Sequence, residues 1–325
     1  MSTAAEKSFN VLRILNEHSD EDHPLNATEI CGYLAISGID TERRSIYRSI
    51  QGLDQAGYDI VKAGKDGWFI GRKLETVEIK ILMDAVQQAH FLTYNKSNDL
   101  IGKLLGLTSK NIAAELRKQV SLSNRPKHDN ESIYYNIDKI NTCIVKNKKL
   151  SFSYFDYDTK GNRVFRKENC KYTANPYFTT WYNENYYMIA ATNNYNNFSH
   201  YRIERMTDLE IINEPRRNIS ELAPNGFDLA DYLNKAFSMF TGKPETIRLR
   251  IKNSMANQVF DRFGINMLLA PADDEHSYLR ADAVIDKGLV SWIISYRNNI
   301  EVIQPDKLKQ EVVAHCREVL GIYEE

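Results

Sequence analysis

Two groups of residues in this 325-residue chain have the types and spacing to do chemistry. In the first, arginine, tyrosine and glutamine recur three and four residues apart, which places them on one face of a helix. Arginine can bridge guanine O6 and N7 or hold a phosphate, and glutamine can read adenine. The pattern predicts a helix that lies in the major groove of DNA, presenting Arg44, Tyr47, Arg48 and Gln51 with Arg43 beside them.

The second group lies on a predicted strand that carries His200, Arg202 and Arg205. Strict alternation puts His200 and Arg202 on one face of that strand and Arg205 on the other. We therefore expect the strand to end or bulge after Glu204 if both arginines serve one site. Two arginines beside a histidine favour an anionic ligand. The alternative is that each arginine forms a salt bridge, with Glu204 or Glu184 as partner.

Two tyrosines join this second group as candidates for contact with a ligand. Tyr154 ends the alternating stretch Ser151–Tyr154 and could stack on a ligand, or lie in the core with its hydroxyl at the rim. Tyr186 lies in an apolar stretch whose composition is mainly that of a core strand. Both are kept as candidate effector-binding residues.

Sequence motifs for catalysis are missing. The chain has no phosphate-binding Gly-x-x-x-x-Gly-Lys loop, no Gly-x-Ser-x-Gly, no Gly-x-Gly-x-x-Gly and no His-Glu-x-x-His. Its seven histidines are dispersed. The acidic stretch Ala272–His276 favours a solvated turn over a metal site. We therefore expect a binding protein with no catalytic residue, no cofactor and no metal.

The elements that must position the first group lie in residues 1–73. We expect three helices and then a hairpin, at Glu6–His18, from Asn26, at Thr41–Ala56, and at Tyr58–Lys62 with Trp68–Ile70. Asn26 with Glu29 predicts a capping box, Asp40 can cap the third helix, and Gly57 can end it. This order is typical of a winged helix-turn-helix. Lys62, Lys65 and Arg72 are then expected to contact phosphates from the hairpin or beside it.

Charge is distributed unevenly along this region. Residues 43–72 hold six basic and three acidic side chains, whereas residues 1–42 hold two basic and eight acidic ones. The positive charge is therefore concentrated where a duplex would lie, although the whole chain has a net charge of -1.

Three further regions follow. Residues 74–133 are predicted to be a helical connector, with a buried stripe at Leu82, Ala85, Val86, Ala89 and Leu92 and a polar linker at 123–130. Residues 134–240 are predicted to hold several short strands after one helix, which suggests a small barrel with a turn at Asp158–Asn162. Residues 241–325 read as an α+β unit. The fold class is therefore multidomain α+β.

Bulk properties agree with an intracellular protein. The hydrophobic fraction is 42%, and the sequence contains no apolar run long enough to span a membrane and no secretory signal at its start. The four cysteines are scattered, which favours a reducing cytoplasm.

Three stretches resemble parts of known families of bacterial regulators. Tyr186–Met188 followed by Arg202 and Arg205 resembles the core of a WYL domain, with tyrosine and methionine where the name motif has tryptophan and leucine. Arg44–Arg48, followed by a leucine, a glycine and the Gly67–Trp68 pair, resembles a DeoR-type winged helix. The C-terminal region, from Leu289 to Tyr323, resembles the extension that commonly follows a WYL domain.

This resemblance implies an Sm-like or SH3-like barrel for residues 134–240 and ligand-controlled transcription as the function. The implied partners are duplex DNA, an anionic effector such as a nucleotide or a single-stranded nucleic acid, and a second copy of the chain, because two half-sites need two linked heads. The alternative is an accessory protein that binds RNA or single-stranded DNA without promoter specificity. A hydrolase with an unrecognised site is a third interpretation, disfavoured by the missing motifs.

Overall fold

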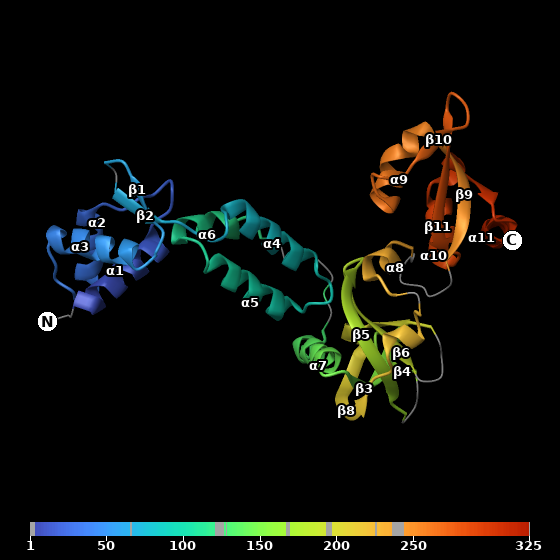
Figure 1. The fold of residues 1–325 in the computed structure, drawn as a ribbon, viewed down its shortest axis with the longest axis horizontal. Helices are drawn as coiled ribbons and strands as arrows, with labels where there is room; N and C mark the ends of the chain where they lie inside the picture. Colours follow the sequence, from blue (N-terminus) through green and yellow to red (C-terminus); the bar gives the residue numbers. More distant parts are fainter. Residues whose placement is uncertain are drawn as a thin grey trace. The chain divides into compact units, whose positions relative to one another are not determined.

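The computed structural model describes residues 4–65, 67–120, 127, 129–166, 170–192, 197–224, 226–235 and 244–324. The chain divides into two compact units, Met1–Glu131 and Ser132–Glu325 (Figure 1). Most of the predicted linker at 123–130, and Asp66 in the predicted hairpin turn, lie outside the described residues. In the described part, no helix is long and apolar enough to cross a membrane.

The first unit begins with a bundle of three helices and a hairpin, here called the head (residues 4–70). Its elements are α1 (Ala4–His18), α2 (Ala27–Ile36), α3 (Arg43–Gln55), β1 (Ile60–Ala63) and β2 (Gly67–Ile70). Apolar side chains from all of these elements share one core, among them Leu15, Ile30, Ile50 and Trp68. The predicted order of helices and hairpin is confirmed.

The hairpin is attached to the start of α2 as well as to itself. The backbones of Leu25 and Trp68 exchange two hydrogen bonds, both of 2.9 Å. Gly67 makes this approach possible, because a Cβ at this position would lie 2.2 Å from the carbonyl oxygen of Leu25. Its φ of +126° is also one that other residues rarely adopt. The hairpin is therefore held against the helices by a position that requires glycine.

The helix ends confirm two of three predicted signals. Asn26 and Glu29 form a full capping box at α2. Gly57 follows α3 with φ +89°, and the Tyr58 amide donates to the Leu53 carbonyl, as in a Schellman motif. The prediction that Asp40 caps α3 is wrong, because the helix begins two residues later than expected, with Glu42 at the N-cap.

The head is followed by a helical connector of α4 (Thr76–Gln88), α5 (Tyr94–Leu105) and α6 (Lys110–Arg117). The buried residues of α4 include Ile79, Met83 and Val86, whereas Leu82 is 41% exposed. The predicted stripe is confirmed at Val86, Ala89 and Leu92, which are buried, and is wrong at Leu82, where Met83 is buried instead. The helix also ends at Gln88, before the last two residues of the predicted stripe.

The second unit opens with α7 (Ile133–Val145), which packs on a curled sheet. The strands are β3 (Lys148–Tyr157), β4 (Arg163–Phe165), β5 (Tyr172–Tyr182), β6 (Asn185–Thr192), β7 (Ser199–Arg202) and β8 (Met206–Pro215). The order is β4-β3-β5-β6-β7, and β8 pairs with β3, so the sheet curls into a half-barrel. The short helix η1 (Ile203–Arg205) joins β7 to β8 at the corner. The predicted turn at Asp158–Asn162 is confirmed by hydrogen bonds that Asp158 accepts.

After α8 (Leu229–Lys235), residues 244–324 form a sheet covered by helices. Its strands are β9 (Pro244–Lys252), β10 (Leu269–Pro271), β11 (His276–Val284) and β12 (Ile300–Gln304), in the order β10-β11-β9-β12. The helices are α9 (Ala256–Phe263), α10 (Lys287–Ser295) and α11 (Asp306–Tyr323). A core of buried residues such as Leu249, Val259, Leu289 and Leu308 joins them.

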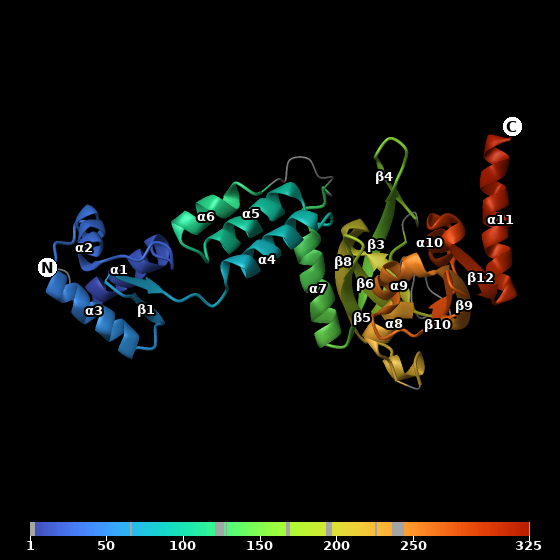
Figure 2. The ribbon, with the colours of Figure 1, turned by 90° about the horizontal axis from the view of Figure 1, so that it is seen from above.

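Helix α11 is anchored only at its beginning. Leu308 is fully buried and Val312 packs on the core, but every described residue from Val313 to Glu324 is exposed. Figure 2 shows the far part of α11 standing clear of β9 and β12, with the C-terminus at its tip.

Candidate nucleic-acid interface and arginine cluster

Helix α3 presents two different faces. Ile46, Ile50 and Leu53 are buried in the head, as their spacing predicted. The residues predicted to read DNA are all exposed on the helix: Arg43, Arg44, Tyr47, Arg48 and Gln51. Among the described residues, the arginines of this set form no ion pair with a carboxylate. Their guanidinium groups are therefore available to an external anion.

The hairpin adjoins this exposed face. The ring of Tyr47 contacts Trp68 of β2 edge-on, with 5.1 Å between ring centroids. Lys62 pairs with Trp68 in the hairpin register, and both Lys62 and Lys65 are exposed. Tyr47 thus connects the α3 face to the hairpin that carries the two lysines.

Arg72 does not contribute to this surface, contrary to expectation. Its guanidinium donates to the carbonyl oxygens of Leu107 at 2.9 Å, Asn16 at 2.6 Å and Ser19 at 3.2 Å. Burial lowers the pKa of Arg72. The side chain joins the end of α1 to the connector, and a side chain held by three carbonyls is not free to bind phosphate.

A second contact between the head and the connector lies beside Arg72. Asp20 is 5% exposed and accepts a hydrogen bond from Ser109, the N-cap of α6. Its other carboxylate oxygen lies 2.7 Å from Nδ1 of His23. Burial raises the pKa of Asp20, but the hydrogen bonds from Ser109 and His23 outweigh burial and leave it lowered. Nearby, Lys110 donates to Glu17 at 2.6 Å.

The strand that carries the second group ends at Arg202, two residues before the end or bulge expected after Glu204. The guanidinium Nε of Arg202 donates to the fully buried Glu204 at 2.5 Å, and Nη2 donates to Asn185. The backbone amide of Arg202 donates to the hydroxyl of Tyr154 at 3.2 Å. Glu204, one of the two salt-bridge partners considered from the sequence, therefore contacts Arg202.

Arg205 lies in η1, and the turn of this helix lets it reach a different carboxylate. Its Nη1 donates to Asp156 at 2.9 Å. Arg166 binds the same carboxylate with two hydrogen bonds, of 2.6 and 3.2 Å. The hydrogen bond from Arg166, helped by the charge of Arg205, lowers the pKa of Asp156. The carboxylate of Asp156 therefore accepts hydrogen bonds from two arginines at once.

Tyr154 contacts both Arg202 and Arg166. It is 5% exposed, and its ring packs edge-on against Phe152 and Tyr201. The guanidinium of Arg166 lies over the ring, 4.9 Å from its centroid. Burial raises the pKa of Tyr154. One face of the Tyr154 ring is therefore already covered by Arg166.

The other two predicted residues make contacts elsewhere. Nε2 of His200 lies 3.0 Å from the hydroxyl of Tyr232 in α8, whose pKa burial raises to about 12. The hydroxyl of Tyr186 lies 3.3 Å from that of Thr179. The structure therefore brings Arg202, Arg205 and Tyr154 into one cluster and gives His200 and Tyr186 other partners.

These contacts define what is here called the arginine cluster: Arg202, Glu204, Arg205, Asp156, Arg166, Asn185 and Tyr154. Sequence reasoning missed Asp156, Arg166 and Asn185. Alternation along β3 could have found Asp156, which lies two residues after Tyr154 and so on the same face. Arg166 carried no such signal, because it follows β4 and reaches the site only through the pairing of β3 with β4.

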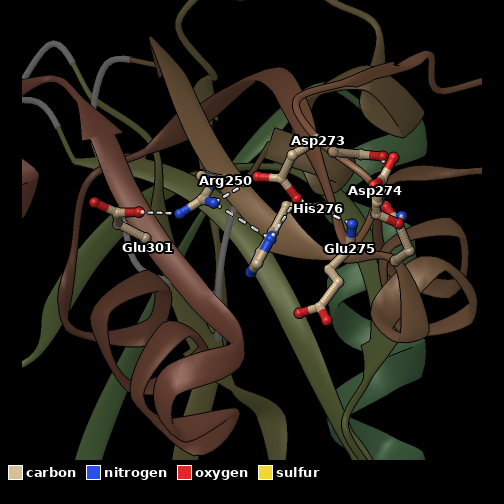
Figure 3. A network of polar contacts seen from close by, with 8 residues as sticks. Arg250, Asp273, Asp274, Glu275, His276 and Glu301 are labelled. Carbon is tan, nitrogen blue, oxygen red and sulfur yellow. Dashed lines mark hydrogen bonds and ion pairs between the residues drawn. The ribbon is translucent and has the colours of Figure 1, made fainter.

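The acidic stretch near residue 273 is neutralised by its neighbours (Figure 3). Asp273 accepts hydrogen bonds from Arg250 at 2.6 Å, and Nδ1 of His276 lies 2.8 Å from its carboxylate. These contacts, that of Arg250 first, lower the pKa of Asp273. Arg250 also reaches Glu301 at 3.4 Å. Over the described residues, no three histidine, cysteine or acidic side chains are grouped to hold a metal ion.

Comparison with known proteins identifies two domains in the second unit. The WYL domain family matches residues 135–211, which span α7 and the curled sheet through the arginine cluster. The WCX domain family matches residues 243–320, which span the sheet of β9–β12 and most of α11.

Two similarities extend over most or all of the chain. The chain is 21% identical over 300 residues to YobV of Bacillus subtilis (strain 168), described as an uncharacterized HTH-type transcriptional regulator, covering 86% of this chain and 90% of the relative. Among solved structures it resembles the proteasome accessory factor B/C (PafBC) of Arthrobacter aurescens, with 15% identity and a TM-score of 0.31. This chain spans 50% of that one, and an overlap so loose adds nothing to the assignment.

A WYL domain and a WCX domain therefore follow each other in the second unit, in the order expected of the regulators that the sequence resembles. The relative that covers most of the chain is named as a transcriptional regulator of the helix-turn-helix type. Together, these matches support a WYL-domain transcriptional regulator.

Proposed function

We propose that this protein is a ligand-responsive bacterial regulator that binds duplex DNA through a winged helix-turn-helix in its head. The observation that carries the proposal is the face of α3 on which Arg44, Tyr47, Arg48 and Gln51 are exposed, beside a hairpin with two exposed lysines. A recognition helix in the major groove needs such a face, and a wing needs cations that reach phosphates. The role is binding, in the bacterial cytoplasm, and not catalysis.

The test is a salt-dependent binding measurement on duplexes selected from a random pool. Each arginine that reads a base is worth about 1–3 kcal/mol, so the Arg44→Ala/Arg48→Ala variant is expected to bind at least about thirtyfold more weakly. Its slope of binding against salt should also become shallower. Arg117→Ala, which removes an exposed arginine from the end of α6, is the matched control.

Unchanged affinity in the double variant would remove the DNA-reading role from α3. Sequencing the nucleic acid bound by the wild-type chain separates the two function classes. One enriched duplex motif supports the regulator, whereas RNA or single strands without a motif support an accessory protein.

We further propose that the arginine cluster is the effector site and that the effector is anionic. Arg205 and Arg166 converge on one carboxylate, and Arg202 lies close by on the other side of Tyr154. An anion such as the phosphate of a nucleotide or of a single-stranded nucleic acid can replace Asp156 on these guanidinium groups. The turn at η1, which places Arg205 beside Arg202, also supports the Sm-like barrel expected for this domain.

Binding of a short 5′-phosphorylated single-stranded DNA, followed by fluorescence anisotropy, tests the effector site. Arg205→Gln should weaken binding about tenfold, because one charge-assisted hydrogen bond contributes about 1.5–3 kcal/mol. Arg280→Gln changes an exposed arginine of β11 outside the cluster and is the control. Equal loss in both variants would mean that the probe is held by general positive charge.

A further inference from the structure

Helix α7 places a polar side chain in the core of its domain. The buried residues of this helix recur at spacings of three and four and share one face: Ile133, Asn136, Ile140 and Cys143. Asn136 is 5% exposed. A buried amide is unfavourable unless it is hydrogen-bonded, whereas an apolar residue of the same size would suit this face without a partner. The partners of Asn136 therefore indicate what it does.

The partners of Asn136 lie at the two ends of η1. Its side-chain nitrogen donates to the carbonyl oxygen of Met206 at 2.9 Å and, more weakly, to that of Ile203 at 3.5 Å. Across the same turn, the Met206 amide donates to the Ile203 carbonyl. Ile203 and Met206 are fully buried, so these carbonyls have little access to water that could replace the amide of Asn136. The asparagine therefore fixes the position of η1 against α7.

The turn held in this way carries two charged residues of the arginine cluster. Glu204, which accepts from Arg202, and Arg205, which donates to Asp156, both belong to η1. A phosphate is bulkier than the carboxylate that it would replace, so the guanidinium of Arg205 must shift to receive it. Because η1 is a turn of three residues, we expect this shift to reach its backbone.

On its other side, α7 follows directly on the linker from the first unit. The ammonium group of Lys127 donates to the carbonyls of Val86 at 3.1 Å and Ala89 at 2.9 Å, at the end of α4. It also donates to the hydroxyl of Ser97 in α5, at 3.0 Å. The chain is thus fixed to the connector at Lys127 and enters α7 at Ile133. A displacement of α7 therefore reaches the connector through a short stretch of chain.

We infer that Asn136 couples the arginine cluster to DNA binding by the head, because it passes a shift of η1 to α7 and so to the linker and the connector. Asn136 is a positioning residue that contacts neither the effector nor DNA. The inference rests on the proposed effector site and concerns its regulation: it names the contact through which occupancy of that site changes the affinity for DNA. Such coupling is reciprocal, so DNA changes the affinity for the effector by the same factor.

The coupling factor is the ratio of the DNA dissociation constants measured without and with the effector probe. Anisotropy of a labelled duplex from the selected pool gives this ratio for the full chain, with unlabelled 5′-phosphorylated single-stranded DNA as the probe. Coupling factors are typically about 5–150-fold. Asn136→Leu keeps the volume but removes the donor, and should reduce the factor about three- to tenfold. If that variant does not fold, Asn136→Ala makes the same test without added bulk.

Two further variants separate this coupling from other effects. The part of the probe's effect that persists in Arg205→Gln does not pass through the cluster, for example competition at α3, and is subtracted. Lys139→Met is the matched control, because Lys139 lies on the same helix and donates to the Leu209 carbonyl of β8 at 2.8 Å. It fastens α7 to the sheet at a place other than η1, so the coupling factor should stay unchanged.

Amide hydrogen exchange with and without the probe gives a second readout, which needs no DNA. In the wild type and in Lys139→Met, the probe should change protection in residues 203–206 and in the first turns of α7. In Asn136→Leu the change should stop at residues 203–206. Protection of β3 and β8 without the probe shows that each variant is folded.

Equal coupling in Asn136→Leu and the wild type overturns the inference and leaves both proposed binding sites in place. An equal loss in Lys139→Met also overturns it, because any loosening of α7 would then suffice. A wild-type chain that binds duplex and probe without coupling overturns it as well, and leaves DNA reading by α3 intact. Failure of the proposed function gives a different result, in which the wild-type chain binds neither the duplex nor the probe.

Discussion

Replacing Arg72 by alanine should open the junction between the head and the connector. Its guanidinium donates to three backbone carbonyls, two of them at 2.9 and 2.6 Å, in residues on both sides of the junction. Hydrogen bonds from a charged donor contribute about 1.5–3 kcal/mol each. Losing two such bonds, taken at the low end because water can reach part of the site, lowers the free energy of opening the junction by about 3 kcal/mol. The equilibrium constant for opening then rises about a hundredfold.

Amide hydrogen exchange in α6 is the suitable measurement, because a multidomain chain need not unfold in one step. Protection in Lys110–Arg117 should fall by about the same hundredfold in Arg72→Ala, and by less in Arg72→Lys, which keeps the charge but loses the fork. Lys73→Ala alters the exposed neighbour and should change nothing. If the free energy of opening α6 in Arg72→Ala lies within about 0.5 kcal/mol of the wild-type value, the reasoning is refuted, because water would then replace the lost hydrogen bonds at no cost.

Three further outcomes are expected. Gly67→Ala should lower the unfolding temperature of the head and reduce its free energy of unfolding by about 1–3 kcal/mol or more, because the added Cβ would meet the backbone of Leu25 at a φ that alanine avoids. Gly64→Ala, at φ +53° in open space, is the control and should reduce the free energy of unfolding by less. The pairing with Asp20 raises the pKa of His23, so its contribution to stability is fully present below about pH 6.5 and is lost as pH rises through the raised value. Thermal unfolding of His23→Gln should thus differ from wild type at pH 6 and converge with it at pH 9; equal differences at both would exclude the pairing. Asp156→Asn should tighten binding of the single-stranded DNA probe several-fold by anisotropy, since the carboxylate then no longer competes for two arginines, and weaker binding would show that Asp156 positions them instead.

The parts of the fold that depend on local pattern were predictable from the sequence. The helical period placed Ile46, Ile50 and Leu53 in the core and left the arginines of α3 outside. The capping box at Asn26 and the stop at Gly57 were readable because each uses residues within one turn of the helix. In α4 the period alone could not choose between the neighbouring apolar residues Leu82 and Met83, and Leu82 was misplaced.

The parts that depend on distant backbone were not predictable. Arg72 is of a residue type that binds phosphate and lies beside the predicted wing. In the structure, however, its guanidinium donates to backbone carbonyls 56 and 35 residues away in the sequence. Carbonyl oxygens carry no side-chain signal, so no pattern could point to them. In the same way, alternation showed that Arg205 needed a strand end, yet its partner Asp156 follows only from the pairing across the sheet.

The contacts of Arg72 and Asp20 also determine how force could pass along the first unit. Both tie the loop after α1 to the region where α6 begins, and α1 packs directly on α3 in the core of the head. With the junction closed, these contacts couple α6 to the head, so a rotation of this helix is expected to be passed to α3 through α1. A signal that arrives at the connector would then change the aim of the α3 arginines without changing their shape.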